Sequence, residues 1–352
     1  MVQRSFIRRP FVVVLVGIII VSAFFLIRSL QGSVGQGNLS SALPPKPQAE
    51  VVPTATPTKA PGDPLLSFFI LSDIHVSAGI PAYSNQLKKA LDDIKSFKDP
   101  VEAIMLTGDV TDTGAPGDYK EYKKIMSQYK LPPIYANMGN HDYYNVWLDK
   151  DGQWSQKTFP NGKTDAMARE AFMSLFNLEK PYHDANLNGL PFILLSQEAY
   201  VQEKPEVGEG AWYSDEQMNW FKSKIDASKG KPVFVMIHQE LPAKGQDGGT
   251  HRLIRAKQFR EIVKSNPNVF IFSGHTHQDL ENDREHYIKE TFHWFKNSSV
   301  SRVLNTKYEQ ARKTSSQGLY VQVYEDKVVV RGREFSDRTW IDKANWTVKL
   351  TK

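Results

Sequence analysis

Two kinds of hydrophobic pattern alternate along the chain from Leu65 onward. Amphipathic segments with helical spacing separate short runs that are almost continuously apolar. Such runs are typical of strands that are covered on both faces. They comprise residues 66–71, 103–106, 134–138, 192–195, 233–237 and 269–272. Strands that alternate with helices predict a layered α/β (α+β) domain.

The predicted helices have recognisable start signals and apolar faces. Ser84 is placed to cap a helix whose apolar face includes Leu87, Leu91 and Ile94. Residues 119–129 repeat the same spacing, and Ser214 opens a capping-box sequence before another amphipathic run. Residues 256–264 predict a further helix.

The last part of the chain has a different hydrophobic pattern. Residues 319–324 and 327–333 alternate between apolar and polar side chains around a Glu325-Asp326 turn, which predicts a β-hairpin. Residues 340–350 predict a further edge strand. With these strands included, residues 65–352 are expected to form one domain.

The first 64 residues have a separate character. Residues 11–27 carry no charge and follow three arginines, and as a helix they would span about 25 Å. We expect residues 1–28 to be an uncleaved single-pass signal anchor that leaves the rest of the chain outside the cell membrane. Signal cleavage with secretion and a buried core helix are the alternatives. Residues 29–64, rich in Pro, Ser and Thr, predict a flexible linker.

Composition and charge narrow the possible functions. The 352-residue chain has no cysteine, which excludes disulfides, thiolate metal sites and a cysteine nucleophile. Its net charge is +5, but residues 1–28 hold four arginines and no acid, so 40 basic and 39 acidic groups remain in the rest. Residues 29–352 are therefore nearly neutral, and their charge gives no strong indication of nucleic-acid binding.

Polar side chains with metal-binding chemistry follow most of the predicted strands. Because the carboxyl ends of the strands form the ligand-binding edge of an α/β sheet, these side chains are expected to meet there. Their carboxylate, amide and imidazole groups suit two neighbouring divalent ions, of which Mn, Fe, Zn and Ni all remain possible. Asp109 is the best candidate for a negative ligand that bridges the pair. The residues are Asp73, His75, Asp109, Asp112, Asn140, His141, His238, His275 and His277.

Each motif taken singly is equally compatible with a structural role. Asp-x-His occurs by chance, Gly-Asn-His-Asp also suits a turn, and a lone histidine is more often a hydrogen-bonded structural residue. The complete series, with each motif following an apolar strand, favours a metal site instead.

The ordered series resembles the calcineurin-like metallophosphoesterase superfamily over residues 66–280. The resemblance implies a four-layer α/β/β/α sandwich with a dinuclear metal centre. It implies that His141 is the general acid and that Asp112 orients it. By the same resemblance, one ion takes Asp73, His75, Asp109 and His277, and the other takes Asp109, Asn140, His238 and His275.

Three departures from related patterns restrict the subfamily. Purple acid phosphatases have a tyrosine ligand near the position of Thr111, and this chain has none there. Many relatives have a second histidine where this chain has Gln239. Protein Ser/Thr phosphatases have an arginine where Thr113 stands, so phosphoprotein substrates lose support.

The sequence therefore predicts a membrane-anchored, extracytoplasmic phosphoesterase. A metal-bound hydroxide is expected to attack a phosphomonoester or phosphodiester, and His141 to donate a proton to the leaving group. Tyr143 and His251 are candidate substrate contacts, whereas His286, His293 and Trp294 are expected to be structural or part of a lid. The alternatives are a nuclease or cyclic-nucleotide phosphodiesterase with the same centre, and a non-catalytic binding scaffold of the same fold.

Overall fold

The computed structural model describes residues 62–351 of the chain. The predicted signal anchor at residues 11–27 and nearly all of the predicted linker lie outside the described residues. Between residues 62 and 351, no helix is both long enough and apolar enough to cross a membrane.

The first of two six-stranded sheets is built on the predicted strands at the start of the domain and on the C-terminal hairpin. Strands β1, β2 and β3 are parallel to one another, whereas β10, β11 and β12 pair antiparallel. The predicted hairpin and edge strand are confirmed. In spatial order the strands are β12 (Thr339–Lys349), β11 (Lys327–Glu334), β10 (Gln317–Val323), β1 (Leu66–Leu71), β2 (Ala103–Thr107) and β3 (Ile134–Asn137).

The second sheet is parallel in its middle and antiparallel at both edges. Strands β5, β6 and β7 confirm the remaining apolar runs. The short edge strands and β9 are not evident from the hydrophobic pattern, because they are brief or mix polar with apolar residues. In spatial order the strands are β4 (His183–Leu187), β5 (Leu190–Leu194), β6 (Val233–Met236), β7 (Val269–Ser273), β9 (His293–Lys296) and β8 (Tyr287–Lys289).

The helices begin for reasons that their first residues explain. Ser214 accepts a hydrogen bond from the backbone N–H of Gln217, which confirms it as a cap. Ser84 is not a cap: its helix begins at Pro81, whose fixed φ suits the first helical position, and Ser84 is buried inside it. The helices are α1 (Pro81–Lys95), α2 (Pro116–Met126), α3 (Asp165–Phe176), α4 (Asp215–Ala227) and α5 (Ala256–Val263), with the 3₁₀ helices η1 (His141–Trp147) and η2 (Pro205–Val207).

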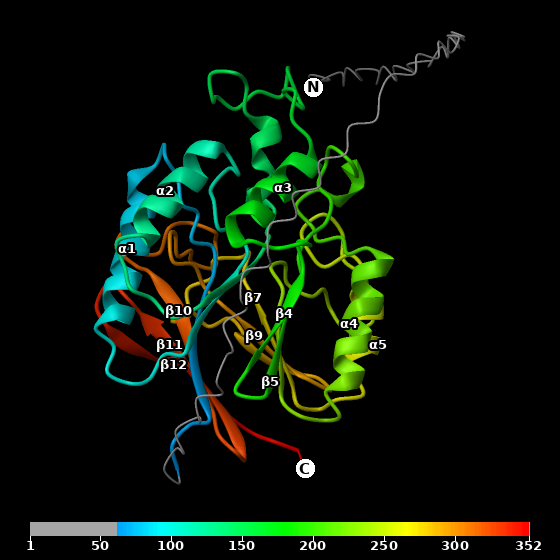
Figure 1. Ribbon diagram of the computed structural model, residues 1–352. Coiled ribbons are helices and arrows are strands. Elements are labelled where there is room, and N and C mark those ends of the chain that lie inside the picture. The colour runs from blue at the N-terminus through cyan, green and yellow to red at the C-terminus, as the bar shows by residue number, and fades with distance from the viewer. Residues whose placement is uncertain (1–61, 352) are drawn as a thin grey trace, which may run out of the picture. The chain divides into compact units, whose positions relative to one another are not determined.

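Three hydrophobic clusters separate four layers. One cluster packs α1, α2 and α3 on the first sheet, and another packs α4 and α5 on the second sheet. The middle cluster joins the two sheets face to face, with Phe68 of β1 in edge contact with Phe192 and Phe234 of the second sheet. Figure 1 shows α1 and α2 on one side of the sheets and α4 and α5 on the other. The order helix, sheet, sheet, helix is the predicted α/β/β/α sandwich.

Candidate metal centre

The predicted metal ligands lie just after five strands, at their carboxyl ends. Asp73 and His75 follow β1, Asp109 follows β2, and Asn140 follows β3. The second sheet supplies the remaining ligands after β6 and β7. These are His238, His275 and His277. Donors that are up to 204 residues apart in the sequence, from Asp73 to His277, thus meet at one edge of the sandwich.

The backbone of the ligands is strained. Asp73, His75, Asp109, His275 and His277 have φ values of 52°, 40°, 50°, 74° and 54°, in the left-handed region that non-glycine residues rarely adopt. Such strain costs on the order of 1–3 kcal/mol per residue and persists where the surrounding structure enforces it. β1 ends two residues before Asp73, so Asp73 and His75 belong to the loop that follows the strand.

Two glycines allow the two sheets to approach closely. A Cβ atom at Gly108, where φ is 79°, would overlap the imidazole of His238 from the other sheet. A Cβ atom at Gly139 would overlap the carboxylate of Asp109. The glycines that precede Asp109 and Asn140 therefore make room for donor side chains.

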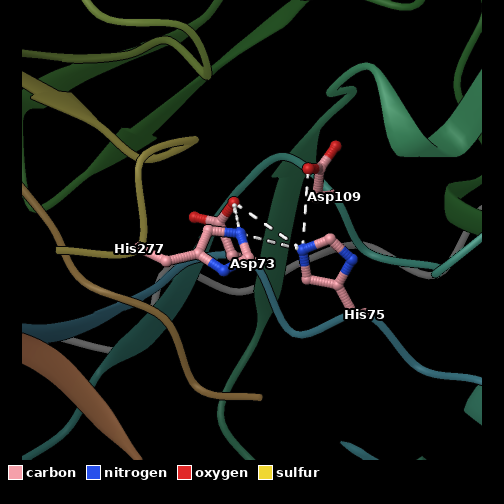
Figure 2. A group of neighbouring side chains, drawn as sticks. All are labelled: Asp73, His75, Asp109 and His277. Carbon is pink, nitrogen blue, oxygen red and sulfur yellow. Dashed lines mark hydrogen bonds and ion pairs between the residues drawn. The ribbon is translucent and has the colours of Figure 1, made fainter. Parts of the chain in front are cut away.

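Four predicted ligands of one ion form the first donor group. The donor atoms of Asp73, His75, Asp109 and His277 all lie within 4.8 Å of one another. The Nε2 atoms of His75 and His277 are 3.1 Å apart, and His277 Nε2 lies 2.9 Å from Asp73 Oδ1. Figure 2 shows these four side chains turned toward a common point.

The second donor group shares Asp109 with the first. His238 Nε2 lies 3.1 Å from Asp109 Oδ2 and 3.2 Å from Asn140 Oδ1. Asn140 Oδ1 is also 3.1 Å from His275 Nδ1. Asp109 thus occupies the position between both groups that a bridging ligand requires.

The histidine hydrogen bonds fit metal binding. His238 Nδ1 contacts the carbonyl oxygen of Thr107 at 2.8 Å, and His277 Nδ1 contacts that of Arg302 at 3.0 Å. A carbonyl oxygen can only accept, so in both rings Nδ1 carries a proton and Nε2 is the atom that faces the donor groups, where a bound ion would take its lone pair. This is the arrangement that histidine ligands of metals usually adopt.

The electrostatics of the cluster also suit cations. Burial raises the pKa of Asp73 and Asp109, but neighbouring imidazoles outweigh it and keep both carboxylates ionised. Burial, reinforced by nearby histidines, lowers the pKa of His75 to about 4 and that of His275 to about 3. Both rings are therefore neutral at pH 7 and can offer a lone pair.

His141 lies beside the first donor group, and its ring is held mainly by the backbone. Its Nδ1 atom donates a hydrogen bond to the carbonyl oxygen of Asp112 at 2.8 Å. The Asp112 carboxylate is 3.9 Å from His141 Nδ1 but 3.5 Å from His75 Nδ1. Asp112 therefore orients His141 through its main chain, while its side chain is closer to His75.

Neither predicted substrate contact lies at the centre. Tyr143 is fully buried, and its hydroxyl donates to the carbonyl oxygen of Gln197. The next residue of η1, Tyr144, faces the cavity beside the donors, with its ring 4.0 Å from that of His141. His251 is exposed and does not line this cavity. Its neighbour Arg252 forms an ion pair with Glu240.

Glu209 is a polar residue of the site that the strand-end pattern did not reveal. Its carboxylate accepts hydrogen bonds from Asn140 Nδ2 at 2.7 Å, from Tyr144 at 2.6 Å and from Tyr200 at 2.8 Å. It belongs to the irregular segment between η2 and α4. The only local signal is the pair of flanking glycines in Gly208-Glu209-Gly210.

Gln239, which stands where many relatives have histidine, supports the same segment. Its Nε2 atom donates to Gln197 Oε1 at 2.8 Å and to the carbonyl oxygen of Glu209 at 3.1 Å. It is fully buried and does not line the cavity. Its role in this structure is to hold the loop that carries Glu209.

A cavity of about 220 Å³ opens over the donor groups. Its walls combine metal donors, the proposed general acid and residues from two loops that follow the strands. The lining residues are Asp109, Asn140, His141, Tyr144, Glu209, His275, Thr276, His277, Arg302, Leu304 and Tyr308.

The two donor groups that share Asp109 form a candidate dinuclear metal centre at one edge of the sandwich. The family described as calcineurin-like phosphoesterase matches residues 66–279, and the chain belongs to this family. As a member of this family, it is a hydrolase that acts on phosphoester bonds.

Solved structures share the fold at low sequence identity. A dimetal phosphatase from Danio rerio is 13% identical with a TM-score of 0.59, and the match covers 82% of this chain and 100% of that one. A purple acid phosphatase from yellow lupin (Lupinus luteus) seeds is 11% identical with a TM-score of 0.52, covering 81% of this chain and 53% of that one. A comparison with curated protein sequences gave no match.

Proposed function

We propose that the protein hydrolyses phosphomonoesters or phosphodiesters with two divalent ions held by the two donor groups. The observation that carries this proposal is the place of Asp109 in both groups. Two adjacent cations repel each other, and a shared carboxylate offsets that repulsion. When bound, such a pair supplies an activated water and charge stabilisation for the phosphoryl oxygens.

The residues of the chain have distinct roles in this proposal. The buried carboxylates and imidazoles hold the ions, and Glu209 keeps the Asn140 amide turned so that its oxygen faces His238 and His275. His141 lies in the cavity wall, and its Nδ1–H group donates a hydrogen bond to the carbonyl oxygen of Asp112. In the imidazolium form of the ring, the Nε2 proton is therefore free to pass to the departing alkoxide, which leaves the ring neutral.

The donor set admits more than one metal. Oxygen and imidazole ligands without thiolate are compatible with Mn, Fe, Zn and Ni, and availability then decides which is bound. Metal analysis of the purified protein would identify the two bound ions.

The catalytic roles are separable by two substitutions. Asp109→Asn should lose bound metal and activity together, because it removes the shared negative charge. His141→Gln should keep the metal and lower kcat by about 10²–10⁴-fold, the usual contribution of a general acid. His251→Gln is the matched control, since His251 is exposed and outside the cavity. Full activity on an aryl phosphate after either test substitution would reject the mechanism.

A substrate panel addresses the ester class. Aryl, nucleotide, lipid and polyol phosphates, each as monoester and diester, distinguish a general phosphatase from a nuclease or a cyclic-nucleotide phosphodiesterase. The near-neutral charge of residues 29–352 argues against long nucleic acids as substrates.

We further propose that residues 11–27 anchor the enzyme in the cell membrane with the catalytic domain outside. The support comes from the uncharged segment and the arginines in front of it. Fractionation of cells that express the full chain should recover activity with membranes, and external protease should release it. Activity in the medium would instead indicate cleavage and secretion.

A further inference from the structure

Arg302 occupies a fixed position in the wall of the catalytic cavity. It follows β9 in a serine-rich segment that also holds the backbone of a metal donor: the hydroxyls of Ser299 and Ser301 both donate to the carbonyl oxygen of Asp73 at 2.9 Å. The backbone N–H of Arg302 donates to Ser299 Oγ, and its carbonyl oxygen accepts from His277 Nδ1. The backbone of Arg302 is therefore linked by hydrogen bonds to two metal donors, to Asp73 through Ser299 and to His277 directly.

The guanidinium of Arg302 lacks an acidic partner. Its Nε atom is buried without a hydrogen bond, and among residues 62–351 no carboxylate forms an ion pair with it. Two buried arginines elsewhere are paired: Arg260 contacts Glu290 at 2.8 Å, and Arg333 contacts Asp93 at 2.7 Å. An uncompensated cation beside a cavity is costly unless an anion joins it there.

Arg302 is the arginine in the wall of the cavity over the donor groups. Carboxylates at or beside the donor groups include Asp73, Asp109, Asp112 and Glu209, and two divalent ions would offset most of this negative charge. An anionic ligand in the cavity would then lie next to Arg302.

We propose that Arg302 binds the non-ester oxygens of the substrate phosphoryl group and favours the phosphomonoester dianion over the phosphodiester monoanion. This inference rests on the proposed function. A guanidinium presents a planar pair of N–H donors that matches two phosphate oxygens, and the attraction grows with the charge of the phosphate. A diester has fewer free oxygens and half the charge.

The test compares Arg302→Gln and Arg302→Lys with Lys307→Gln. Lys307 is an exposed cation of the same segment that does not line the cavity, so its substitution removes one charge without altering the wall. For an aryl phosphate monoester, Arg302→Gln should lower kcat/KM by about 10–100-fold, mostly through KM, as loss of a charged hydrogen bond predicts. The loss for the corresponding diester should be at least threefold smaller. Arg302→Lys should recover part of the monoester rate, and Lys307→Gln should match the wild type.

A second measurement does not depend on turnover. Inorganic phosphate at alkaline pH should raise the melting temperature of the metal-loaded wild type and of Lys307→Gln, but raise that of Arg302→Gln much less. Equal phosphate stabilisation in all three proteins, or equal losses for monoester and diester, would overturn the assignment of Arg302. If the wild type hydrolysed no ester in the panel, the proposed function would fail, and the phosphate-dependent melting shift would still decide whether Arg302 binds the anion.

Discussion

The oxygen and the nitrogen of the Asn140 side-chain amide have different partners. Its oxygen faces His238 and His275, while its nitrogen donates to Glu209 at 2.7 Å. An amide without such a partner can rotate and present its NH₂ group to a cation. Glu209 therefore acts as a positioning residue for a metal donor.

Glu209→Gln should lower metal affinity or kcat by about 10–100-fold, the usual effect of losing a partner that orients a ligand. Glu206→Gln is a suitable control because Glu206 is an exposed acid of the same segment. Metal titration followed by kinetics at saturating metal measures both effects. If Glu209→Gln bound metal and turned over substrate like the control, Asn140 would not depend on this carboxylate.

His293 provides a pH-dependent contribution to stability away from the metal centre. It is buried in β9, stacks on Phe270, and contacts the Tyr287 hydroxyl at 2.9 Å and Lys289 Nζ at 3.0 Å. Burial and the charge of Lys289 lower its pKa to about 4. Protonation between this value and the ordinary value of about 6.5 therefore favours the unfolded chain.

The free energy of unfolding should consequently fall as the pH is lowered from about 6.5 toward 4, and His293→Phe should make this fall shallower. Phenylalanine keeps a ring against Phe270 and cannot titrate. Urea unfolding of wild type and variant at about pH 7 and about pH 5 measures the difference, in which the metal-site histidines common to both proteins cancel. Parallel pH profiles would show that His293 does not contribute.

Short sequence motifs reveal the metal donors more readily than the residues around them. Asp73 and Asp109 could be predicted because each follows an apolar strand, and topology then brings strand ends together. Glu209 and Arg302 come from irregular loops, whose paths no periodic pattern specifies. The incorrect choice of Tyr143 arose because the phase of a short 3₁₀ helix decides which of two adjacent tyrosines faces the cavity.

At the scale of elements, burial on both faces explains what could be predicted. The central strands β1, β2, β6 and β7 are completely buried, so their sequences are continuously apolar. The edge strands β4 and β8 contain exposed and polar positions and lack that signal. Helix α3 was also missed, although Thr164 caps it by accepting from the N–H of Met167.

One buried ion pair ties the first helix to the C-terminal hairpin. Asp93 of α1 accepts from Arg333 of β11 through both carboxylate oxygens, at 2.7 and 2.9 Å. These elements are 240 residues apart in the sequence. Removing only one partner leaves the other as an uncompensated buried charge.

Asp93→Ala should therefore reduce the free energy of unfolding by about 3–5 kcal/mol. Asp92→Ala, at the exposed neighbouring position of the same helix, should cost less than about 1 kcal/mol. Urea denaturation followed by circular dichroism gives both values. Similar losses for the two variants would mean that the pair with Arg333 adds little to the docking of α1.

At the scale of the whole described domain, the metal donors come from both sheets. Asp73, His75, Asp109 and Asn140 extend from the first sheet, and His238, His275 and His277 extend from the second. Bound ions would link the two halves of the sandwich across their shared edge. Metal binding should for that reason stabilise the folded domain as well as enable catalysis.

Chelation should lower the melting temperature of the wild type, because an ion at 100 times its Kd contributes about 2.7 kcal/mol to stability. Asp109→Asn should melt at the same temperature with and without chelator. Differential scanning calorimetry before and after EDTA treatment, followed by readdition of metal, makes the comparison. A wild type that was indifferent to EDTA while its bound metal was lost would contradict the link between the sheets.

Five of the metal donors have left-handed backbone, which places them for metal binding but makes the folded chain less stable. Glycine adopts that conformation without penalty, so Asp73→Gly or His275→Gly should relax the loop even as it removes a donor. Laboratory evolution that rewarded survival at high temperature without metal, and ignored turnover, should therefore accumulate glycines at these positions. Such selection would therefore remove the metal ligands, and with them the catalytic centre, before other parts of the molecule changed.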